Sequence, residues 1–423
     1  GRGPDGAEPP NNWQSVFHGP AWTRVTEPDG RPGQWYLHLF DRGQPDWNWR
    51  NPAVNSYFED IIRFWLGRRA AGLRIDVAHG LFKDPNLADL TSLPAPHAPS
   101  AYYHRAELHE LYRLWRTILD SYVPGEFPGP RTAVGEVWYD SPGTLAPYLA
   151  ETGLPQVFNF QLILASWDAA AMRGAVDAIQ SLAGGDRAPW VIGNHDVARP
   201  VSRYALGLGG EPNESFGLPR VGDPQLRVGV RRARAAALLS LALPGSAYIY
   251  QGDELGLPEV VELPDGARQD PTFRRSGGTV PGRDGCRVPL PWTSTGPSFG
   301  FSTGSRDREH AAPWLPQPSY WGQYSVARQI DDPGSFLNLY RAALKLRRTH
   351  PALGRGSGPD GPLMTWLETA PGTLCFTREP GFVFAMNLGP AAAPMPKHAW
   401  ILLASDPVTD GKLPPDTAVW LAS

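Results

Sequence analysis

The chain has 423 residues, enough for one large core domain and a smaller companion. Its 39 Lys and Arg against 42 Asp and Glu give a formal net charge of −3, and no basic run is present, which argues against nucleic acid or an anionic membrane as the main partner. Cys286 and Cys375 are too few for a disulfide framework, and no apolar run reaches the roughly 18 residues of a membrane span.

The N-terminal region begins with Gly1 rather than Met, and its first thirty or so residues, rich in Gly, Pro and Asn, are predicted to form a loop. No signal peptide is visible, which is uninformative if upstream sequence has been lost, so we expect a cytoplasmic location only with that reservation. Gln34 to Phe40 is predicted to be a short strand.

Helices and strands are predicted to alternate between residues 51 and 250. Asn51-Pro52 fits the cap and first position of a helix whose apolar face carries Phe58, Ile62 and Trp65. The elements expected after that helix are a strand at 72–79, a helix at 103–122, a Pro-Gly loop, strands at 132–138 and 156–164, a helix at 166–182, a strand at 189–196, a helix at 226–243 and a strand at 246–250. Such alternation is typical of a parallel sheet with crossover helices.

The C-terminal region changes character. A long Pro- and Gly-rich excursion from Leu255 to Gln329 precedes a predicted helix at Ser335 to Thr349. Strands are then expected at 364–367, 374–377, 382–387, 400–403 and 418–421, which predicts a small antiparallel β-domain. The predicted division is therefore residues 1–50 as an inserted loop domain, 51–350 as the catalytic domain and 351–423 as the C-terminal β-domain.

The stretch Gly72 to His79 carries the strongest signal. Its apolar residues alternate with Arg74 and Asp76, which places these two charges on one face of a predicted buried strand. An unpaired buried charge is costly, so polar partners are expected opposite them. We therefore predict an active site at this strand.

Polar residues end three of the predicted strands: Asp76, Glu136, and the run Asn194-His195-Asp196. A parallel barrel collects its chemistry at the carboxyl ends of its strands, because the βα loops emerge there. We therefore expect three carboxylates to converge at one mouth. A lone acidic residue at a strand end is more often structural, and it is the coincidence of three that favours catalysis.

Three converging carboxylates suit retaining cleavage of a glycosidic bond, which needs one ionised nucleophile and one protonated acid about 5 to 5.5 Å apart. Arg74 favours the ionised form of Asp76, the predicted nucleophile. Glu136, on an apolar strand beside Trp138, is the predicted general acid. Asp196 is expected to stabilise the transition state, with His195 as a neighbouring donor.

Three motifs in this order resemble the second, third and fourth signatures of glycoside hydrolase family 13, the α-amylase family: Gly-Leu-Arg-Ile-Asp-Val-Ala-His at 72–79, Gly-Glu-Val-Trp at 135–138 and Gly-Asn-His-Asp-Val-Ala-Arg at 193–199. The segments 11–22, 36–40 and 44–49, and Arg-Asp-Gly-Cys-Arg-Val-Pro at 283–289, are similar to the α-glucosidase and oligo-1,6-glucosidase branch.

This resemblance implies an exo-acting retaining α-glucosidase with Asp76 as nucleophile, Glu136 as acid and base, and Asp196 as stabiliser. It implies that Arg74, His195 and Arg287 bind the substrate. It also implies a (β/α)8 TIM-type barrel of class α/β, and because the family's first signature is not found, we expect about the first three strands to be missing. The hypothesis is a fragment that is unstable or inactive when expressed alone.

Other residues receive structural interpretations. His18 and His79 are expected to be loop or packing residues, and no metal and no cofactor are predicted. The segment Gln251 to Glu254 is expected to have a structural role. Arg231, Arg232 and Arg234 are expected to lie on a solvated helix face.

Alternative functions share the same carboxylates. A transglycosylase or isomerase, such as a trehalose synthase or a sucrose-converting enzyme, differs in how well water competes for the glycosyl intermediate. Val77, directly after the predicted nucleophile, resembles the residue of members that accept α-1,6 links. A non-catalytic binding module is the third alternative, and it predicts lost carboxylates, whereas all three are present. The expected partner is an oligosaccharide, with no nucleic acid and no membrane.

Overall fold

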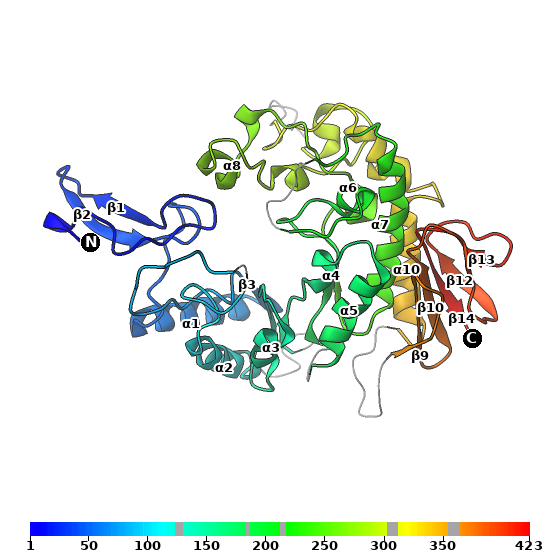
Figure 1. Cartoon of the computed structure of the whole chain (residues 1–423), viewed down its shortest axis with the longest axis horizontal. Helices are drawn as coiled ribbons and strands as arrows, with labels where there is room; N and C mark the ends of the chain where they lie inside the picture. Colours follow the sequence, from blue (N-terminus) through cyan, green and yellow to red (C-terminus); the bar gives the residue numbers. More distant parts are fainter. Residues whose placement is uncertain (96, 123–129, 183–186, 212–216, 303–311, 354–363) are drawn as a thin grey trace. The chain divides into compact units, whose positions relative to one another are not determined.

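The computed structural model describes residues 1–95, 97–122, 130–182, 187–211, 217–302, 312–353 and 364–423. It divides into two compact units (Figure 1). The first unit comprises Gly1–Asn159, Ile179–Ala188 and Arg274–Gly277, and the second comprises Phe160–Ala178, Pro189–Phe273 and Gly278–Ser423. Each unit is described by itself. The predicted boundaries near residues 50 and 350 stay predictions.

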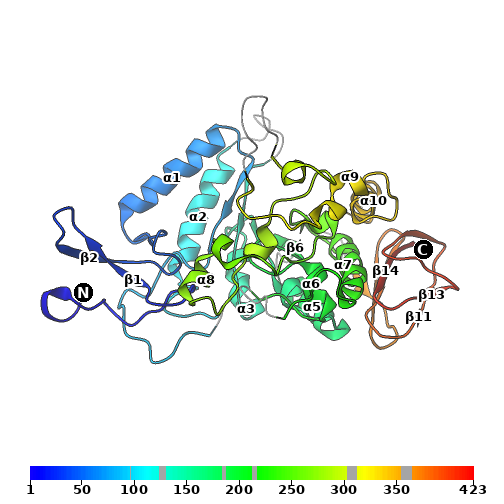
Figure 2. The same ribbon diagram turned by 90° about the horizontal axis from the view of Figure 1, so that it is seen from above.

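The first unit contains a three-stranded parallel sheet in the order β3-β4-β5. Its elements are β1 (Trp22–Thr26), β2 (Pro32–Leu37), α1 (Pro52–Gly67), β3 (Gly72–Ile75), α2 (Glu107–Asp120), β4 (Thr132–Gly135), α3 (Pro142–Leu145) and β5 (Gln156–Val157). The predicted start of α1 is confirmed, because the Asn51 side chain accepts a hydrogen bond from the Ala53 N–H and Pro52 follows it. Helices α1 and α2 lie side by side, as Figures 1 and 2 show.

The second unit contains a parallel pair of short strands, β6 and β7, and most of the helices. Its elements up to residue 349 are α4 (Gln161–Leu164), α5 (Ala169–Gln180), β6 (Trp190–Val191), α6 (Pro200–Ala205), α7 (Gln225–Ala242), β7 (Ala247–Tyr248), α8 (Pro271–Arg275), α9 (Val326–Gln329) and α10 (Phe336–Thr349), with the last residues of α5 and α8 assigned to the first unit. Among the described residues of both units, short 3-10 helices are found at Pro4–Gly6, Ala146–Leu149, Asp253–Leu255, Asp265–Ala267, Asp284–Arg287, Pro297–Gly300 and Trp321–Tyr324.

The C-terminal part of the second unit is an antiparallel sheet in the order β12-β14-β10-β9-β8, which confirms the five predicted strands. Its strands are β8 (Thr365–Trp366), β9 (Thr373–Arg378), β10 (Phe382–Asn387), β12 (Trp400–Ala404) and β14 (Thr417–Ala422), and a separate pair is formed by β11 (Ala393–Pro394) and β13 (Lys412–Leu413). All residues of β10 and β14 are buried, because these central strands are covered on both faces.

Helix α7 packs on the C-terminal sheet through the arginines that were predicted to face solvent. Arg232 Nε lies 2.8 Å from the carboxylate of buried Asp416, Arg231 pairs with the same carboxylate at 3.5 Å, and Arg234 donates to the Ser405 carbonyl. Figures 1 and 2 both show α7 beside β14. The prediction of a solvated face was wrong, because the partners come from residues about 180 positions away in sequence.

Other predictions need correction. Residues 156–164 form β5 followed by helix α4 rather than one strand. Strand β1 lies inside the predicted N-terminal loop, paired with β2, since its partner strand supplies the hydrogen bonds that a local pattern does not reveal. The strands expected at 72–79, 132–138 and 189–196 end early, at Ile75, Gly135 and Val191. Most of the predicted Pro-Gly loop and residues 303–311 of the excursion lie outside the described residues.

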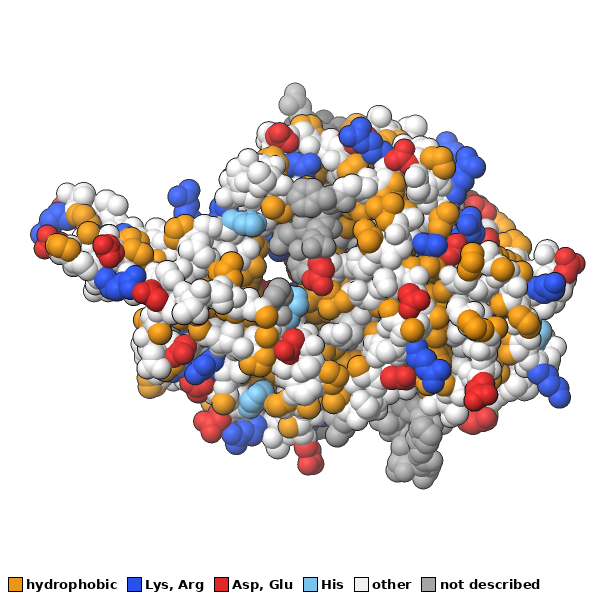
Figure 3. Space-filling view, viewed as in Figure 1, with side chains coloured by type: hydrophobic (Ala, Val, Ile, Leu, Met, Phe, Trp, Pro, Cys, Tyr) orange, Lys and Arg blue, Asp and Glu red, His pale blue; other side chains and the backbone are white. Residues whose placement is uncertain are grey.

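Among the described residues, none of the helices combines the length and the apolar character that crossing a bilayer requires. On the face drawn in Figure 3, Lys and Arg side chains are interspersed with Asp and Glu side chains. This mixture of both signs on the drawn face agrees with a formal net charge of −3, and no large patch of a single sign is seen on it.

Candidate active site

One cluster of predicted site residues, the Arg74 cluster, consists of Arg74, Asp76 and Glu136 in the first unit. The Arg74 guanidinium bridges both carboxylates: Nη1 donates to Asp76 Oδ1, and Nη2 donates to Glu136 Oε2 at 2.7 Å. The strands explain the meeting, because β3 and β4 are parallel neighbours with Ile75 opposite Gly135. Each carboxylate directly follows its paired position at the carboxyl end of its strand.

The Glu136 carboxylate is enclosed and fully engaged. Its side chain is 9% exposed. Besides the bond from Arg74, Oε2 accepts the Val77 N–H at 3.2 Å, and Oε1 accepts the Trp138 indole N–H at 3.1 Å. Val77 reaches this position with φ of 42°, a conformation that β-branched residues rarely adopt. Every one of these donors favours the ionised carboxylate.

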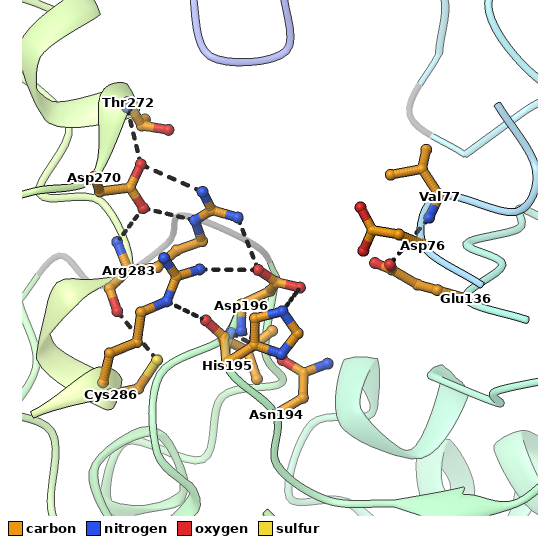
Figure 4. Close-up of polar contacts among 12 residues, drawn as sticks. Asp76, Val77, Glu136, Asn194, His195, Asp196, Asp270, Thr272, Arg283 and Cys286 are labelled. Carbon is orange, nitrogen blue, oxygen red and sulfur yellow. Dashed lines mark hydrogen bonds and ion pairs between the residues drawn. The ribbon is translucent and has the colours of Figure 1, made fainter. Parts of the chain in front are cut away.

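Asp76 differs from the prediction of a buried charged strand. Its side chain is 68% exposed, and β3 ends one residue before it. It lines a cavity of about 430 Å³ in the first unit, together with Arg74 and the apolar side chains Trp47, Leu73 and Ile75. Asp76 is therefore accessible from that cavity, whereas Glu136, which lies beside Asp76 in Figure 4, is buried and held by hydrogen bonds.

His79 supports the loop that follows Asp76, in line with the packing role expected for it. Its ring is buried, lies 4.7 Å from the Tyr103 ring and 5.3 Å from the His104 ring, and contacts the Glu136 carbonyl through Nδ1 at 3.3 Å. Burial, followed by the neighbouring His104, holds the pKa of His79 well below its ordinary value. The imidazole is therefore neutral at pH 7.

The other predicted site residues, His195, Asp196 and Arg287, gather in the second unit. With Asp270 and Arg283 they form the Asp196 cluster, and Figure 4 labels all of its members except Arg287. Oδ1 of Asp196 accepts two guanidinium hydrogen bonds, from Arg283 Nη1 at 2.7 Å and from Arg287 Nη2 at 3.1 Å. Oδ2 lies 3.4 Å from His195 Nε2. Arg287 also donates from Nε to the His195 carbonyl at 2.8 Å, so it binds both the Asp196 side chain and the backbone of the preceding residue.

The loop that carries Asp196 is stabilised by the side chain of Asn194. The Asn194 side-chain oxygen accepts the N–H groups of Asp196 at 2.8 Å and Val197 at 3.1 Å, which is the pattern of an Asx turn. The side chain of Asp196 is 11% exposed. In the polar run 194–196, Asn194 therefore stabilises the loop, whereas Asp196 belongs to the candidate site.

The segment that carries Arg283 and Arg287 rests on a buried polar layer. Arg199 donates from Nη2 to the Cys286 carbonyl at 2.7 Å, and its backbone N–H donates to Glu259 Oε2 at 2.9 Å. A Cβ at Gly285 would lie 2.2 Å from Glu259 Oε1, so only glycine fits there. Burial raises the pKa of Glu259 to about 7, against the opposing hydrogen bond and charge of Arg199.

The structure thus joins Arg74 with Asp76 and Glu136, and joins Asp196 with His195 and Arg287. These sets belong to different units. Sequence reasoning missed two residues of this cluster. Arg283 contacts Asp196 directly, and Asp270 is connected to Asp196 through Arg283. Arg283 stands four positions before Arg287 in the quoted segment, and this adjacency was the available signal.

In the part of the chain that the structure describes, no group of three or more His, Cys, Asp or Glu side chains is arranged to hold a metal ion.

Comparison with known proteins gives a consistent result. The family model described as the catalytic domain of α-amylase matches residues 1–356. The chain is 32% identical over 399 residues to a probable α-glucosidase of Rhizobium meliloti (strain 1021), covering 89% of this chain and 64% of that protein. It is 28% identical over 391 residues to an oligo-1,6-glucosidase of Parageobacillus thermoglucosidasius, covering 84% and 63%.

Solved structures agree in fold. The crystal structure of XgtA, an α-glucosyl transfer enzyme, matches with a TM-score of 0.73 at 31% identity, covering 98% of this chain and 73% of that one. The trehalulose synthase MutB from Pseudomonas mesoacidophila MX-45 matches with a TM-score of 0.75 at 23% identity, covering 99% and 76%, and this similarity concerns the fold alone. The chain spans just under two thirds of the length of the two curated relatives above.

Proposed function

The chain belongs to the α-amylase family, and from that premise we propose that it is a retaining, exo-acting α-glucosidase that hydrolyses α-1,4 or α-1,6 glucosidic bonds of oligosaccharides. The fold expected for this family is an α/β barrel with a C-terminal sheet; in the described residues the parallel strands form two separate sets, β3-β4-β5 and β6-β7, and the C-terminal antiparallel sheet is present. The observation that carries the proposal is the Arg74 guanidinium shared by Asp76 and Glu136, because it couples the charges of the two carboxylates that retention requires.

In the first step, an Asp76 oxygen attacks the anomeric carbon while the bond to the leaving oxygen breaks and Glu136 gives its proton to that oxygen. This step requires Arg74 to be committed to Asp76, since an ion pair with Glu136 favours the ionised form of the acid. The product is a covalent glucosyl ester of Asp76.

In the second step, Glu136 takes a proton from water, the water oxygen attacks the anomeric carbon, and the ester bond to Asp76 breaks. Ester formation has removed the charge of Asp76, so the charge of Arg74 then acts on Glu136 alone. Arg74 thereby favours the ionised Glu136 at the point where a base is needed.

Asp196 is proposed to stabilise the positive charge that develops on the sugar in both steps, with His195 and Arg287 binding its hydroxyl groups. The proposal requires the Arg74 cluster and the Asp196 cluster to act on one glucosyl ring.

Azide rescue tests these roles. We expect Asp76→Gly to be inactive on an aryl α-glucoside and to yield β-glucosyl azide when azide is added, because azide then replaces the missing nucleophile. We expect Glu136→Ala to yield α-glucosyl azide, because azide then attacks the Asp76 ester. If azide rescued neither variant, or gave the opposite anomers, the assignment would be wrong. Hydrolysis by the unmodified chain would also contradict the hypothesis of an inactive fragment.

Glucosyl transfer is the second candidate, favoured by the similarity to an α-glucosyl transfer enzyme at 31% identity. Both reactions share the Asp76 ester and differ only in whether water or a sugar hydroxyl attacks it. Incubation with maltose, isomaltose and sucrose, with products separated by chromatography, distinguishes them. Free glucose as the main product supports the α-glucosidase, whereas trehalose, isomaltulose or longer oligosaccharides support transfer.

A further inference from the structure

We propose that Asp270 is a positioning residue for Asp196: by pairing with Arg283 it offsets one of the two arginine charges that bind the Asp196 carboxylate, so that Asp196 keeps its negative charge available for the sugar. This inference rests on the proposed function and deepens it, because it assigns a role to a buried carboxylate that does not itself touch the substrate.

Asp270 holds Arg283 from the side opposite to Asp196 (Figure 4). Its Oδ2 accepts the Arg283 Nε at 2.6 Å and the Arg283 backbone N–H at 2.9 Å. The terminal nitrogen Nη1 of the same guanidinium donates to Asp196 Oδ1 at 2.7 Å. The guanidinium is therefore oriented on one edge by Asp270 and presents another edge to Asp196.

Asp270 is itself rigidly placed. Its side chain has 0% exposure. Its Oδ1 accepts the Thr272 N–H at 2.9 Å, and its own backbone N–H donates to Asp284 Oδ2 at 2.9 Å. Burial works to raise the pKa of Asp270, but the hydrogen bonds and charge of Arg283 outweigh burial, and the pKa lies below its ordinary value. Asp270 is therefore ionised at pH 7.

The charges of the cluster sum to zero when Asp196, Asp270, Arg283 and Arg287 are all ionised and the His195 ring carries no charge. Without Asp270, the two guanidinium groups would face one carboxylate, and the cluster would carry a net charge of +1. A positive cluster opposes the positive charge that develops on the sugar ring in the transition state and much less the neutral substrate. Loss of Asp270 should therefore lower kcat with little change in KM.

Asp270→Asn, Arg283→Gln and the double variant test the charge balance through kcat and KM for an aryl α-glucoside. Removing one preorganised electrostatic group typically costs about 10²-fold in kcat, which is the loss expected for Asp270→Asn. The double variant removes one charge of each sign and restores the sum, so we expect it to be about tenfold faster than Asp270→Asn. A merely structural role for Asp270 predicts the reverse, since the double variant loses more contacts.

Asp416→Asn is the matched control, because Asp416 is also a buried aspartate clamped by two arginines, Arg231 and Arg232, outside the Asp196 cluster. We expect it to lower thermal stability and leave kcat of the folded protein unchanged. Calorimetry supplies a readout that needs no turnover: Asp270→Asn should weaken binding of the cationic sugar mimic 1-deoxynojirimycin about tenfold more than binding of neutral glucose.

The outcomes separate the two proposals. An active unmodified protein whose kcat is unchanged in Asp270→Asn, or whose kcat falls without recovery in the double variant, overturns the charge balance alone. An unmodified protein that binds the cationic mimic without hydrolysing the glucoside overturns the proposed function, and the binding ratio then decides this inference. A protein that neither hydrolyses nor binds overturns both.

Discussion

The Arg74 cluster and the Asp196 cluster solve opposite electrostatic problems. In the first, one guanidinium serves two carboxylates, and the ionised cluster carries a net charge of −1. In the second, two guanidinium groups bind a single oxygen of Asp196, and Asp270 balances one of them. The two carboxylates of the Arg74 cluster share a single guanidinium, whereas Asp196 is bound by two guanidinium groups at once. The difference fits the proposed roles, which are a nucleophile and an acid in the first cluster and a group that stabilises positive charge in the second.

The largest expected effect comes from the carboxylates of the Arg74 cluster. Asp76→Asn or Glu136→Gln should each lower turnover of an aryl α-glucoside by several orders of magnitude, because both carboxylates are proposed to act in bond breaking. Glu107→Gln, which removes an exposed carboxylate paired with Arg50 in the same unit, is the control and should change turnover less than about threefold. Near-normal turnover of Glu136→Gln would require another acid.

Lysine substitution tests the difference between the two clusters, since Arg74 alone binds two carboxylates, whereas Arg283 and Arg287 both bind Asp196. Arg74→Lys should lower kcat/KM about 10²-fold, because an ammonium group cannot reproduce the fork that bridges two carboxylates. Arg287→Lys should cost only about tenfold, because Arg283 still binds Asp196 at 2.7 Å. Steady-state kinetics of both variants provide the measurement. Equal losses, or a larger loss for Arg287→Lys, would contradict the comparison.

Gly285, in the segment that carries Arg283 and Arg287, packs so closely against Glu259 that any larger residue should destabilise the protein. Gly285→Ala places a Cβ against Glu259 Oε1 and should destabilise the protein by about 1–3 kcal/mol, measured by thermal or urea unfolding. Gly266→Ala is the matched control, since nothing lies within 4 Å of the corresponding Cβ. If Gly285→Ala were as stable as Gly266→Ala, the close approach would not be a packing constraint.

The smallest expected effect is an opposite response of the two units to pH. In the first unit, burial lowers the pKa of His79, His104 and His109, so protonation favours the unfolded chain and stability is lost as the pH falls below about 6.5. In the second unit, burial raises the pKa of Asp253 and Glu259 to about 7, so stability is lost as the pH rises from about 4 toward 7.

Hydrogen exchange at about pH 5 and pH 7.5, corrected for intrinsic exchange rates, resolves the two responses by region. We expect weaker protection around His79 and stronger protection around Glu259 at the lower pH. Glu259→Gln should reduce the response of the second region, since Asp253 still contributes, and should leave that of the first unchanged. Parallel changes in both regions would show that the buried groups do not govern them.

The sequence by itself determined the helix that starts at Asn51, the strands that precede Asp76 and Glu136, and the five C-terminal strands, because these depend on local capping and on the period of apolar residues. It also marked Asp76, Glu136 and Asp196 as candidates, and their roles stay proposals. Only the tertiary structure decided that Arg74 spans two carboxylates, that Asp270 reaches Asp196 through Arg283, and that Arg231 and Arg232 clamp Asp416. The physical reason is that each of these contacts depends on how strands and loops pack, and the identity of a charged residue does not disclose which distant partner will neutralise it.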